Sequence, residues 1–358
     1  MLPVSQIITS QSIASLRTNN SSNTIRYLGE AFFPNKRLSG IDIKWIKSHK
    51  GLGVALKPSN PDALPTIRPR GEAEMTKESL PMFRESREIK EHDLLELSRI
   101  NSTNDPFLPQ VRDSMYDDAN DLLDGAEISA EMMRMQLLSA NGGNMGIAIP
   151  IGDNMVHTFD YDKDGSWKKT HYMELTGNDT WDNPNSKPLN DIDKAKEYLY
   201  NTGTVPAFII GTSATFSYLI NNEQIKNVIL NASGTSTAFM DAQTVQDVIE
   251  RRMGLTKKAY DKLYVGYDGK EKKFYPDDYI TIIGRQQLGS TWRGTTPEEI
   301  TASSNFPNAP VDITVLDSGI AVAIQTKYEP AFRIITTVSQ IVLPSFEGMD
   351  SIFVIKVK

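Results

Sequence analysis

The chain has 358 residues, of which 39% are hydrophobic and 23% are charged, and this composition excludes a wholly disordered protein. Its 38 basic and 45 acidic side chains give a net charge of −7, which argues against a protein that holds nucleic acid by neutralising phosphates. Because the chain has no cysteine, disulfides, thiolate zinc sites and cysteine nucleophiles are excluded. The length predicts two or three domains. No apolar run approaches the ~18 residues of a membrane span, so we expect a cytosolic origin.

The first 24 residues are polar and nearly uncharged. They contain 14 Ser, Thr, Asn or Gln residues and one charged side chain, Arg17. Such a segment has too little apolar surface to offset the entropy of ordering, so we expect an arm. Four apolar residues are placed to form a short amphipathic element if a neighbouring chain offers a groove: Ile7, Ile8, Ile13 and Leu16.

Residues 41–55 alternate like a strand, and a proline-rich, highly charged stretch follows them. Between Arg68 and Asp93, six basic and seven acidic side chains leave too little apolar content for a core. One interpretation is a solvated loop. The other is an excursion that lies on a second subunit, where arginines would meet carboxylates: Arg68, Arg70, Arg84 and Arg87.

Residues 106–140 carry the clearest helical pattern. Apolar residues recur at intervals of three and four, Asp105 can cap the start, and Gly142 suits the end. This predicts one helix about 50 Å long. Counted from Asp105, eight acidic residues outweigh two basic ones. A solvated face is the simplest interpretation, and an acidic functional surface is the alternative; the residues concerned are Asp113, Asp117, Asp121 and Asp124.

Strand patterns cover residues 145–175, and a polar linker over 176–188 marks a domain boundary. From 189 to 284 helices and strands alternate, which predicts a separate α+β domain. It includes a hairpin around the turn Asp268-Gly269. The tail alternates apolar and polar residues again, so we expect it to add strands to an existing sheet.

One loop carries part of the spacing of a calcium site. Asp160, Asp162, Asp164 and Gly165 follow the order D-x-D-x-D-G, but the twelfth position holds His171 instead of glutamate. A hairpin turn is the preferred interpretation, and calcium binding is the alternative. His157 and His171 are placed to face each other across that hairpin, where they would form at most a weak metal site.

No motif supports catalysis. The sequence has no G-x-S-x-G nucleophile elbow and no G-x-x-x-x-G-K phosphate loop. Acidic pairs such as Asp117-Asp118 are adjacent rather than opposed, which suits solvation better than acid–base work. We therefore expect neither an enzyme, nor a metal centre, nor a bound cofactor.

Three motifs, in their order and spacing, resemble the lambda-type major head protein family of tailed bacteriophages, the capsid protein E family. They are Ile67 to Glu72 with the charged run after it, Leu189 to Ile210, and Phe274 to Asp278 with the strand to Gly284. The likeness covers most of the chain. The long helix departs from the family pattern, because it is acidic here whereas it is basic in its first turns in the lambda type.

The resemblance implies an α+β protein with the HK97-like phage capsid fold. It implies an N-terminal arm (1–40), an extended loop called the E-loop (41–95), a peripheral domain (96–188) with a spine helix (106–140) and a hairpin (145–175), an axial domain (189–310), and returning C-terminal strands (311–358). It also implies that E-loop residues contact a neighbouring subunit: Arg68, Arg70, Glu72, Glu74, Arg84 and Arg87.

The implied function is that of a major capsid protein, which assembles into pentamers and hexamers and forms an icosahedral shell around packaged double-stranded DNA. The implied partners are copies of itself, a scaffold, a portal, a decoration protein and non-specifically contacted DNA, with no membrane. The implied location is the virion, after assembly in the host bacterial cytoplasm. Two alternatives remain at this point: another phage polymer, such as a tail tube or connector, and a calcium-binding module that uses residues 160–171.

Overall fold

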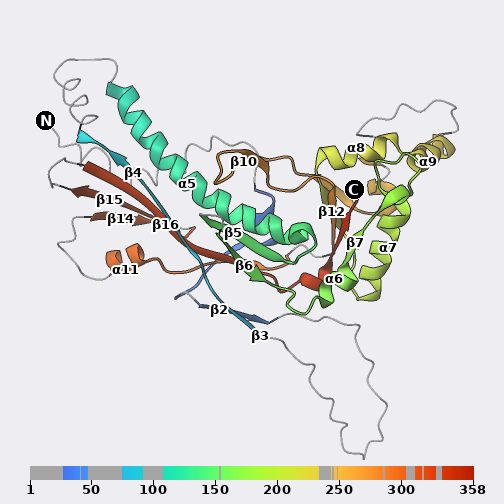
Figure 1. Ribbon diagram of the computed structural model, residues 1–358, viewed down its shortest axis with the longest axis horizontal. Coiled ribbons are helices and arrows are strands. Elements are labelled where there is room, and N and C mark those ends of the chain that lie inside the picture. The colour runs from blue at the N-terminus through green and yellow to red at the C-terminus, as the bar shows by residue number, and fades with distance from the viewer. Residues whose placement is uncertain are drawn as a thin grey trace, which may run out of the picture.

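The computed structural model describes residues 27–40, 42–46, 75–91, 108–152, 155–233, 243, 246–247, 249–284, 287–303, 311–316, 318–327 and 333–358. Figure 1 shows an elongated molecule, in which a long sheet crossed by the helix α5 forms one part and a smaller sheet beside α7, α8 and α9 forms the other. Within the described ranges, no helix is long and apolar enough to cross a membrane.

The helix α5 (Leu108–Leu138) has 31 residues, close to the predicted 106–140. At 1.5 Å per residue it is about 46 Å long. It ends at the turn η1 (Ala140–Gly142), where the backbone takes positive φ angles, including +94° at Gly143. From residue 119 onward the helix buries an apolar stripe against the sheet: Ala119, Leu122, Leu123, Ala126, Ala130, Met133 and Leu137.

The long sheet has six strands, and β16 is its centre. The order is β1-β13-β16-β15-β14, with β4 also paired to β16, and every pairing is antiparallel except β1 with β13. The 13 residues of β16 pair with β15 and β4 over their first part and with β13 over their last part. The strands are β1 (Asn35–Arg37), β4 (Met82–Ile89), β13 (Ser290–Arg293), β14 (Val311–Val315), β15 (Ala321–Lys327) and β16 (Arg333–Ser345).

Two segments join this sheet from regions that the sequence assigned elsewhere. Residues 82–89, expected within the extended loop, form β4 and pair with β16 over eight positions. β13 and the helix α11 (Pro297–Ser303), expected within the axial domain (189–310), also belong to the long-sheet part. Most side chains of β4 are exposed, and many of them are charged. The sequence of this segment therefore gave no indication that it pairs with β16.

The second part is an α+β unit, as the sequence predicts. Its five strands run in the order β7-β17-β12-β8-β9, so the last strand of the chain lies inside the sheet. Thr212 caps α8 by accepting the N–H of Thr215. The elements are β7 (Tyr172–Glu174), α7 (Pro188–Asn201), β8 (Phe208–Gly211), α8 (Ser213–Asn221), α9 (Glu223–Ser233), η3 (Ile249–Met253), β9 (Thr256–Ala259), β12 (Tyr279–Ile283) and β17 (Ile352–Lys356).

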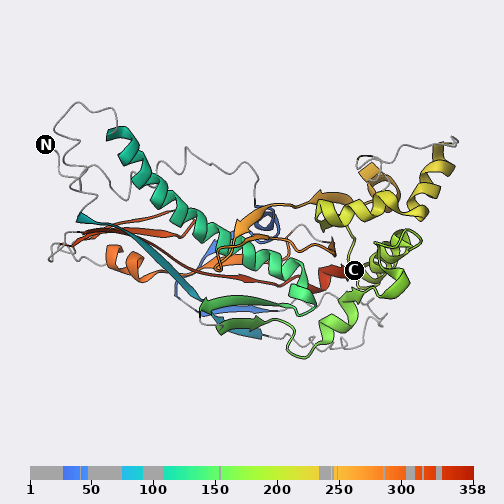
Figure 2. The same ribbon diagram turned by 45° about the horizontal axis from the view of Figure 1, so that its top comes forward.

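Three two-stranded ribbons project from these sheets. The predicted hairpin around Asp268-Gly269 is confirmed as β10 (Leu263–Val265) and β11 (Glu271–Lys273). The other two are β2 (Asp42–Ile46) with β3 (Met75–Ser79), and β5 (Gly146–Gly152) with β6 (Met155–Asp160). Figure 2 shows these two ribbons together below α5, in blue and green, and an ion pair of Lys163 with Glu78 links them.

The predicted hairpin over 145–175 is shorter than expected, because residues 166–171 form the helix α6 (Ser166–His171) instead of a returning strand. The two histidines therefore do not face each other. His157 is exposed on β6, whereas His171 is buried in α6 and stacks on Trp167 with ring centroids 5.6 Å apart. The remaining short elements are α3 (Gly29–Phe32), η2 (Gly177–Asp179) and η4 (Met349–Ser351).

Candidate functional site

The C-terminal half of α5 is buried on every side, and it carries two charged residues into the core. Residues 130–135 are all buried, and four of them are apolar: Ala130, Met132, Met133 and Met135. The side chains of Glu131 and Arg134 are 0% exposed, one helical turn apart. Unpaired charges at such depth would cost several kcal/mol each, so the fold has to supply partners.

Glu131 connects three segments of the chain. Its Oε1 accepts hydrogen bonds from the backbone N–H of Gly29 and from the hydroxyl of Tyr260, both at 2.9 Å. Its Oε2 accepts a hydrogen bond from Nη1 of Arg134 at 3.3 Å. Burial raises the pKa of Glu131, and the positive charge of Arg134 opposes that rise. The carboxylate thereby fixes the N-terminal segment and the strand-to-hairpin connection at Tyr260 to the long helix.

Two buried guanidinium groups complete the cluster. Arg134 donates from Nε to Thr291 and from Nη2 to Asn35, each at 2.8 Å. Arg293 donates from Nη1 to Gln340 at 2.8 Å and from Nη2 to Glu127 at 2.9 Å. Burial lowers the pKa of Arg293, and the carboxylate of Glu127 opposes that shift.

The cluster is charge-balanced, with Glu127 and Glu131 against Arg134 and Arg293, and we call these four residues the joint. Its contacts reach α3, β1, α5, β13 and β16 as well as Tyr260. Gly29 is a requirement of this arrangement, because a Cβ there would lie 2.7 Å from Oε2 of Glu131 and 2.8 Å from Cβ of Arg134. The joint can hold elements in register, and it presents no nucleophile or open cavity for chemistry.

The sequence did not single out these four residues. The signal was present in the run from Ala130 to Leu138, which is apolar on all faces of a helix except for Glu131, Arg134 and Gln136. A helix that is apolar all round is buried, so charges within it must be paired. The partners could not be inferred, because they come from segments more than 100 residues away.

The predicted interface residues divide into two groups. Arg84 and Arg87 lie on β4 with exposed side chains and pair with carboxylates of their own chain, Glu298 on α11 and Asp121 on α5. The Arg87–Asp121 distance is 3.2 Å. The others predicted in this loop, Arg68, Arg70, Glu72 and Glu74, lie outside the described residues.

The acidic face predicted for the long helix is described in part. Asp113 and Asp117 lie within α5, in a stretch whose side chains are outside the described set. The side chain of Asp121 is 64% exposed even though it pairs with Arg87, and Asp124 is half-buried. The part of the helix that the structure describes therefore exposes at least one of these carboxylates beside β4.

The aspartate-rich loop at 160–165 is a helix cap. The carboxylate of Asp162 accepts the N–H groups of Trp167 and Lys168, both at 3.0 Å, at the start of α6. Asp160 accepts the N–H of Asp162 at 2.9 Å. The interpretation as a hairpin turn is thus corrected, because the loop leads into a helix. Over the described residues, no group of three acidic or histidine side chains is arranged to hold a metal ion.

Comparisons with known proteins agree with this architecture. The sequence matches the family model for phage major capsid protein E over residues 14–328. No curated protein matches it significantly. Among solved structures, it is similar to a prophage protein of E. coli CFT073 assigned as a capsid protein, with 12% identity, a TM-score of 0.59 and coverage of 98% of this chain and 99% of that chain.

A phage-related protein from Bordetella bronchiseptica RB50 is similar over 98% of this chain and 97% of its own, with 11% identity and a TM-score of 0.53. Likeness at such identities shows a shared fold, and the family match covers far more than half of the chain. The chain therefore belongs to the phage major capsid protein E family, and it is a structural protein of a tailed-phage capsid with the HK97-like fold.

Proposed function

We propose that the chain forms pentamers and hexamers, which close into an icosahedral shell around packaged double-stranded DNA. The observation that supports this most is the division of the molecule into a rigid elongated body and a separate α+β unit at one end (Figure 1). Subunits of this shape can place the end that carries the α+β unit around a symmetry axis while the long body contacts neighbouring rings. Many modest interfaces, repeated by symmetry, then form a closed shell.

The proposed domains follow the family layout. Residues 189–284 with the strand β17 serve as the axial domain near the five-fold and quasi-six-fold axes, whereas β13 and α11, which lie within the expected bounds 189–310, go with the long sheet. The long helix with β14, β15 and β16 serves as the peripheral domain, and residues 1–40 serve as an arm. The joint supports this division, because it locks the arm's last residues, the helix and the sheet into one body.

The segment between β2 and β3 is the proposed strap over a neighbouring subunit. The two strands pair as a ribbon and fix the two ends of this segment side by side. Because Arg84 and Arg87 already pair with Glu298 and Asp121 of their own chain, we assign the contact with a neighbour to the charged residues that precede β3 in the sequence. We propose that these are Arg68, Arg70, Glu72 and Glu74.

The proposed partners are a scaffold and a portal during assembly, a decoration protein on the shell, and DNA inside it. The acidic face of α5 would line the interior and keep the DNA mobile by short-range repulsion. The protein would be made in the host bacterial cytoplasm and would act without catalysis. A net charge of −7 supports indifferent rather than tight contact with DNA.

Electron microscopy of the purified protein tests the proposal, and closed shells are the expected result. In the Arg70→Glu variant we expect rings that form but do not close into shells, because a strap charge then repels its carboxylate partner. The matched control is Lys169→Glu, which makes the same charge reversal at an exposed residue of α6. A normal yield of closed particles from Arg70→Glu would contradict the strap, and tubes from the unmodified protein would contradict the shell.

The interior assignment has its own test. Reversing Asp117 to Lys, while Asp121 is retained for its pair with Arg87, places a positive charge on the proposed inner face. We expect slower genome ejection from particles of normal shape, because the new charge binds phosphate. Unchanged ejection from normal shells would contradict an inward-facing helix.

A further inference from the structure

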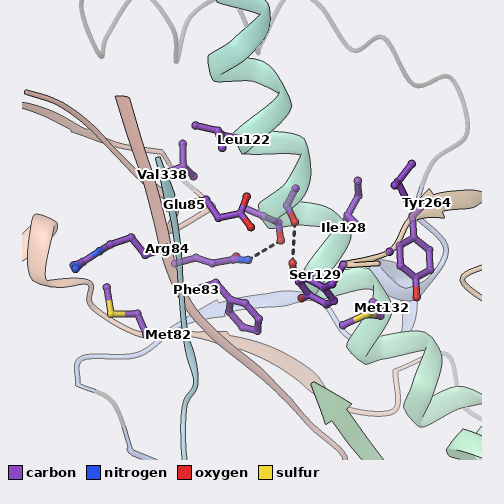
Figure 3. Close-up of a pocket in the computed structure, with 16 residues that line it drawn as sticks. Met82, Phe83, Arg84, Glu85, Leu122, Ile128, Ser129, Met132, Tyr264 and Val338 are labelled. Carbon is purple, nitrogen blue, oxygen red and sulfur yellow. Dashed lines mark hydrogen bonds between the residues drawn. The ribbon is translucent and has the colours of Figure 1, made fainter. Parts of the chain in front are cut away.

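A groove lies between α5, β4 and the β10–β11 hairpin. Its cavity volume is about 400 Å³, and Figure 3 shows Phe83 and Glu85 pointing from β4 towards α5, which contributes Leu122, Ile128 and Met132. The hairpin closes the other side with Tyr264, Val265 and Tyr267. The groove borders the joint at Gln340, which accepts from Arg293, and its lining also includes Arg84, whose guanidinium pairs with Glu298.

The walls of this groove are apolar but not covered. Val265 is 64% exposed, Tyr267 is 56% exposed and Met82 is 41% exposed, although all three line the same hollow. Apolar side chains gathered around a hollow mark a surface that is covered by another segment or molecule. The polar residues of the lining do not explain why apolar side chains are exposed here, because their hydrogen bonds are made within the chain. Ser129 donates to the carbonyl of Gly125 (Figure 3), and Gln340 donates to the carbonyl of Ala126.

The described part of the chain begins beside this groove. The ring of Tyr27 packs edge-on against Phe274, with centroids 6.0 Å apart, and Phe274 packs on Tyr264 at 4.6 Å. Nζ of Lys262 lies 4.0 Å from the centre of the Tyr27 ring. Tyr27 is therefore one buried side chain away from a residue that lines the groove, and an extended chain gains ~3.3 Å with each residue. A few residues before Tyr27 suffice to enter the groove.

The 26 residues that precede Tyr27 have the composition that this surface requires. They include Ile7, Ile8, Ile13 and Leu16, which match the apolar walls. Their charged side chains are two arginines, Arg17 and Arg26, and they contain no acidic residue. The groove presents the exposed carboxylate of Glu85, whose charge together with burial raises the pKa of Tyr267 across the hollow.

We propose that residues 1–26 dock into the groove of their own chain, with their apolar side chains against Val265 and Tyr267 and an arginine near Glu85. Docking would cover the exposed apolar walls and would fasten the β10–β11 hairpin to α5 and β4. The arm would thus act first within its own subunit, before any contact with a neighbour.

The absence of cysteine makes a direct test available. A single Val265→Cys substitution places the protein's one thiol on the groove wall at an exposed position. Its rate of reaction with a maleimide is then measured in two chains, one with the natural arm and one in which Ile7, Ile8, Ile13 and Leu16 are serine. We expect the natural arm to slow the reaction at least tenfold. Met155→Cys on β6, 61% exposed and away from the groove, is the control and should react equally fast in both chains.

A mixing experiment identifies whose arm binds. Cysteine-free protein with an intact arm is added in excess to the Val265→Cys chain that carries the serine arm. Same-chain docking predicts that the fast reaction persists, whereas slowing would show that the arm of a second copy fills the groove and would overturn the proposal. Equal rates at Val265→Cys with either arm, or a matching change at Met155→Cys, would overturn it as well.

Discussion

The carboxylate of Glu131 and the backbone N–H of Gly29 meet at 2.9 Å in the buried core, although 102 residues separate them in the chain. This contact ties the N-terminal segment to the long helix. Because Glu131 also accepts from Tyr260 and from Arg134 of its own helix, one side chain joins three parts of the chain. The stability of the body should therefore depend strongly on the few residues around it.

Substitution of Gly29 by alanine is expected to destabilise the protein by about 1–3 kcal/mol, because the new Cβ would lie within 3 Å of Glu131 and Arg134. The free energy of unfolding in urea measures this. Gly125→Ala in α5 is the control, since a Cβ there meets no atom within 4 Å. That change should stabilise the helix by up to about 1 kcal/mol. Equal effects of the two substitutions would contradict the tight fit at Gly29.

Replacement of Glu131 by leucine should cost about 3–5 kcal/mol, because it leaves the guanidinium of Arg134 buried without its carboxylate. Glu131→Gln should cost clearly less, since its amide oxygen can still accept from Gly29 and Tyr260. Unfolding free energies of the three proteins at pH 7 check the order. A glutamine variant as unstable as the leucine variant would show that charge, rather than hydrogen bonding, holds the joint.

The raised pKa of Glu131 also predicts a pH dependence. A carboxyl whose pKa is higher in the folded state than in the unfolded state stabilises most when protonated, so its contribution is full below about pH 4.5 and declines as pH rises through the folded-state pKa. The unmodified protein should therefore gain stability relative to Glu131→Gln when pH is lowered from 7 towards 4.5. A difference that stays constant between these pH values would contradict the shift.

His171 should make the fold sensitive to acid. Burial lowers the pKa of its imidazole, and the carboxylates of Asp350 and Asp162 oppose the shift only in part. A lowered pKa means that the neutral ring stabilises the fold above about pH 6.5 and that this stability is lost as pH falls through the folded-state value. His171→Phe, which can still stack on Trp167, should therefore lose less stability between pH 7.5 and 5.5. His157→Gln on the exposed face of β6 is the control and should behave like the unmodified protein.

Asp162 is expected to stabilise α6 without calcium. Asp162→Ala should lower the free energy of unfolding by about 1–2 kcal/mol, because the N–H groups of Trp167 and Lys168 lose their acceptor. Asp164→Ala, which removes a carboxylate that accepts from the exposed Ser166, should cost less. Calorimetric titration with calcium should give no binding heat in either variant or in the unmodified protein. Heat that disappears with both substitutions would restore the loop as a cation site.

Much of the secondary structure could be read from local patterns. The extent of α5, the hairpin at Asp268-Gly269 and the alternating helices and strands of the middle region all follow from spacing and turn residues within short windows. The helix α6 was missed because its capping carboxylate, Asp162, precedes it by four residues in a loop that also fits other turns. The charged stretch that contains β4 was interpreted as a loop, and its place beside β16 was not predicted.

By itself, the sequence determined where the chain is polar, where it must be helical and which family it resembles, because helix periodicity, capping and composition depend on residues close together in the chain. Only the tertiary structure decided which strands share a sheet, that Arg134 and Arg293 are buried with Glu131 and Glu127, and that an apolar groove stands open beside Tyr27. These features depend on pairings across 100 residues or more, such as Arg293 with Glu127. Such pairings are selected by the packing free energy of the whole fold, and no local pattern records them.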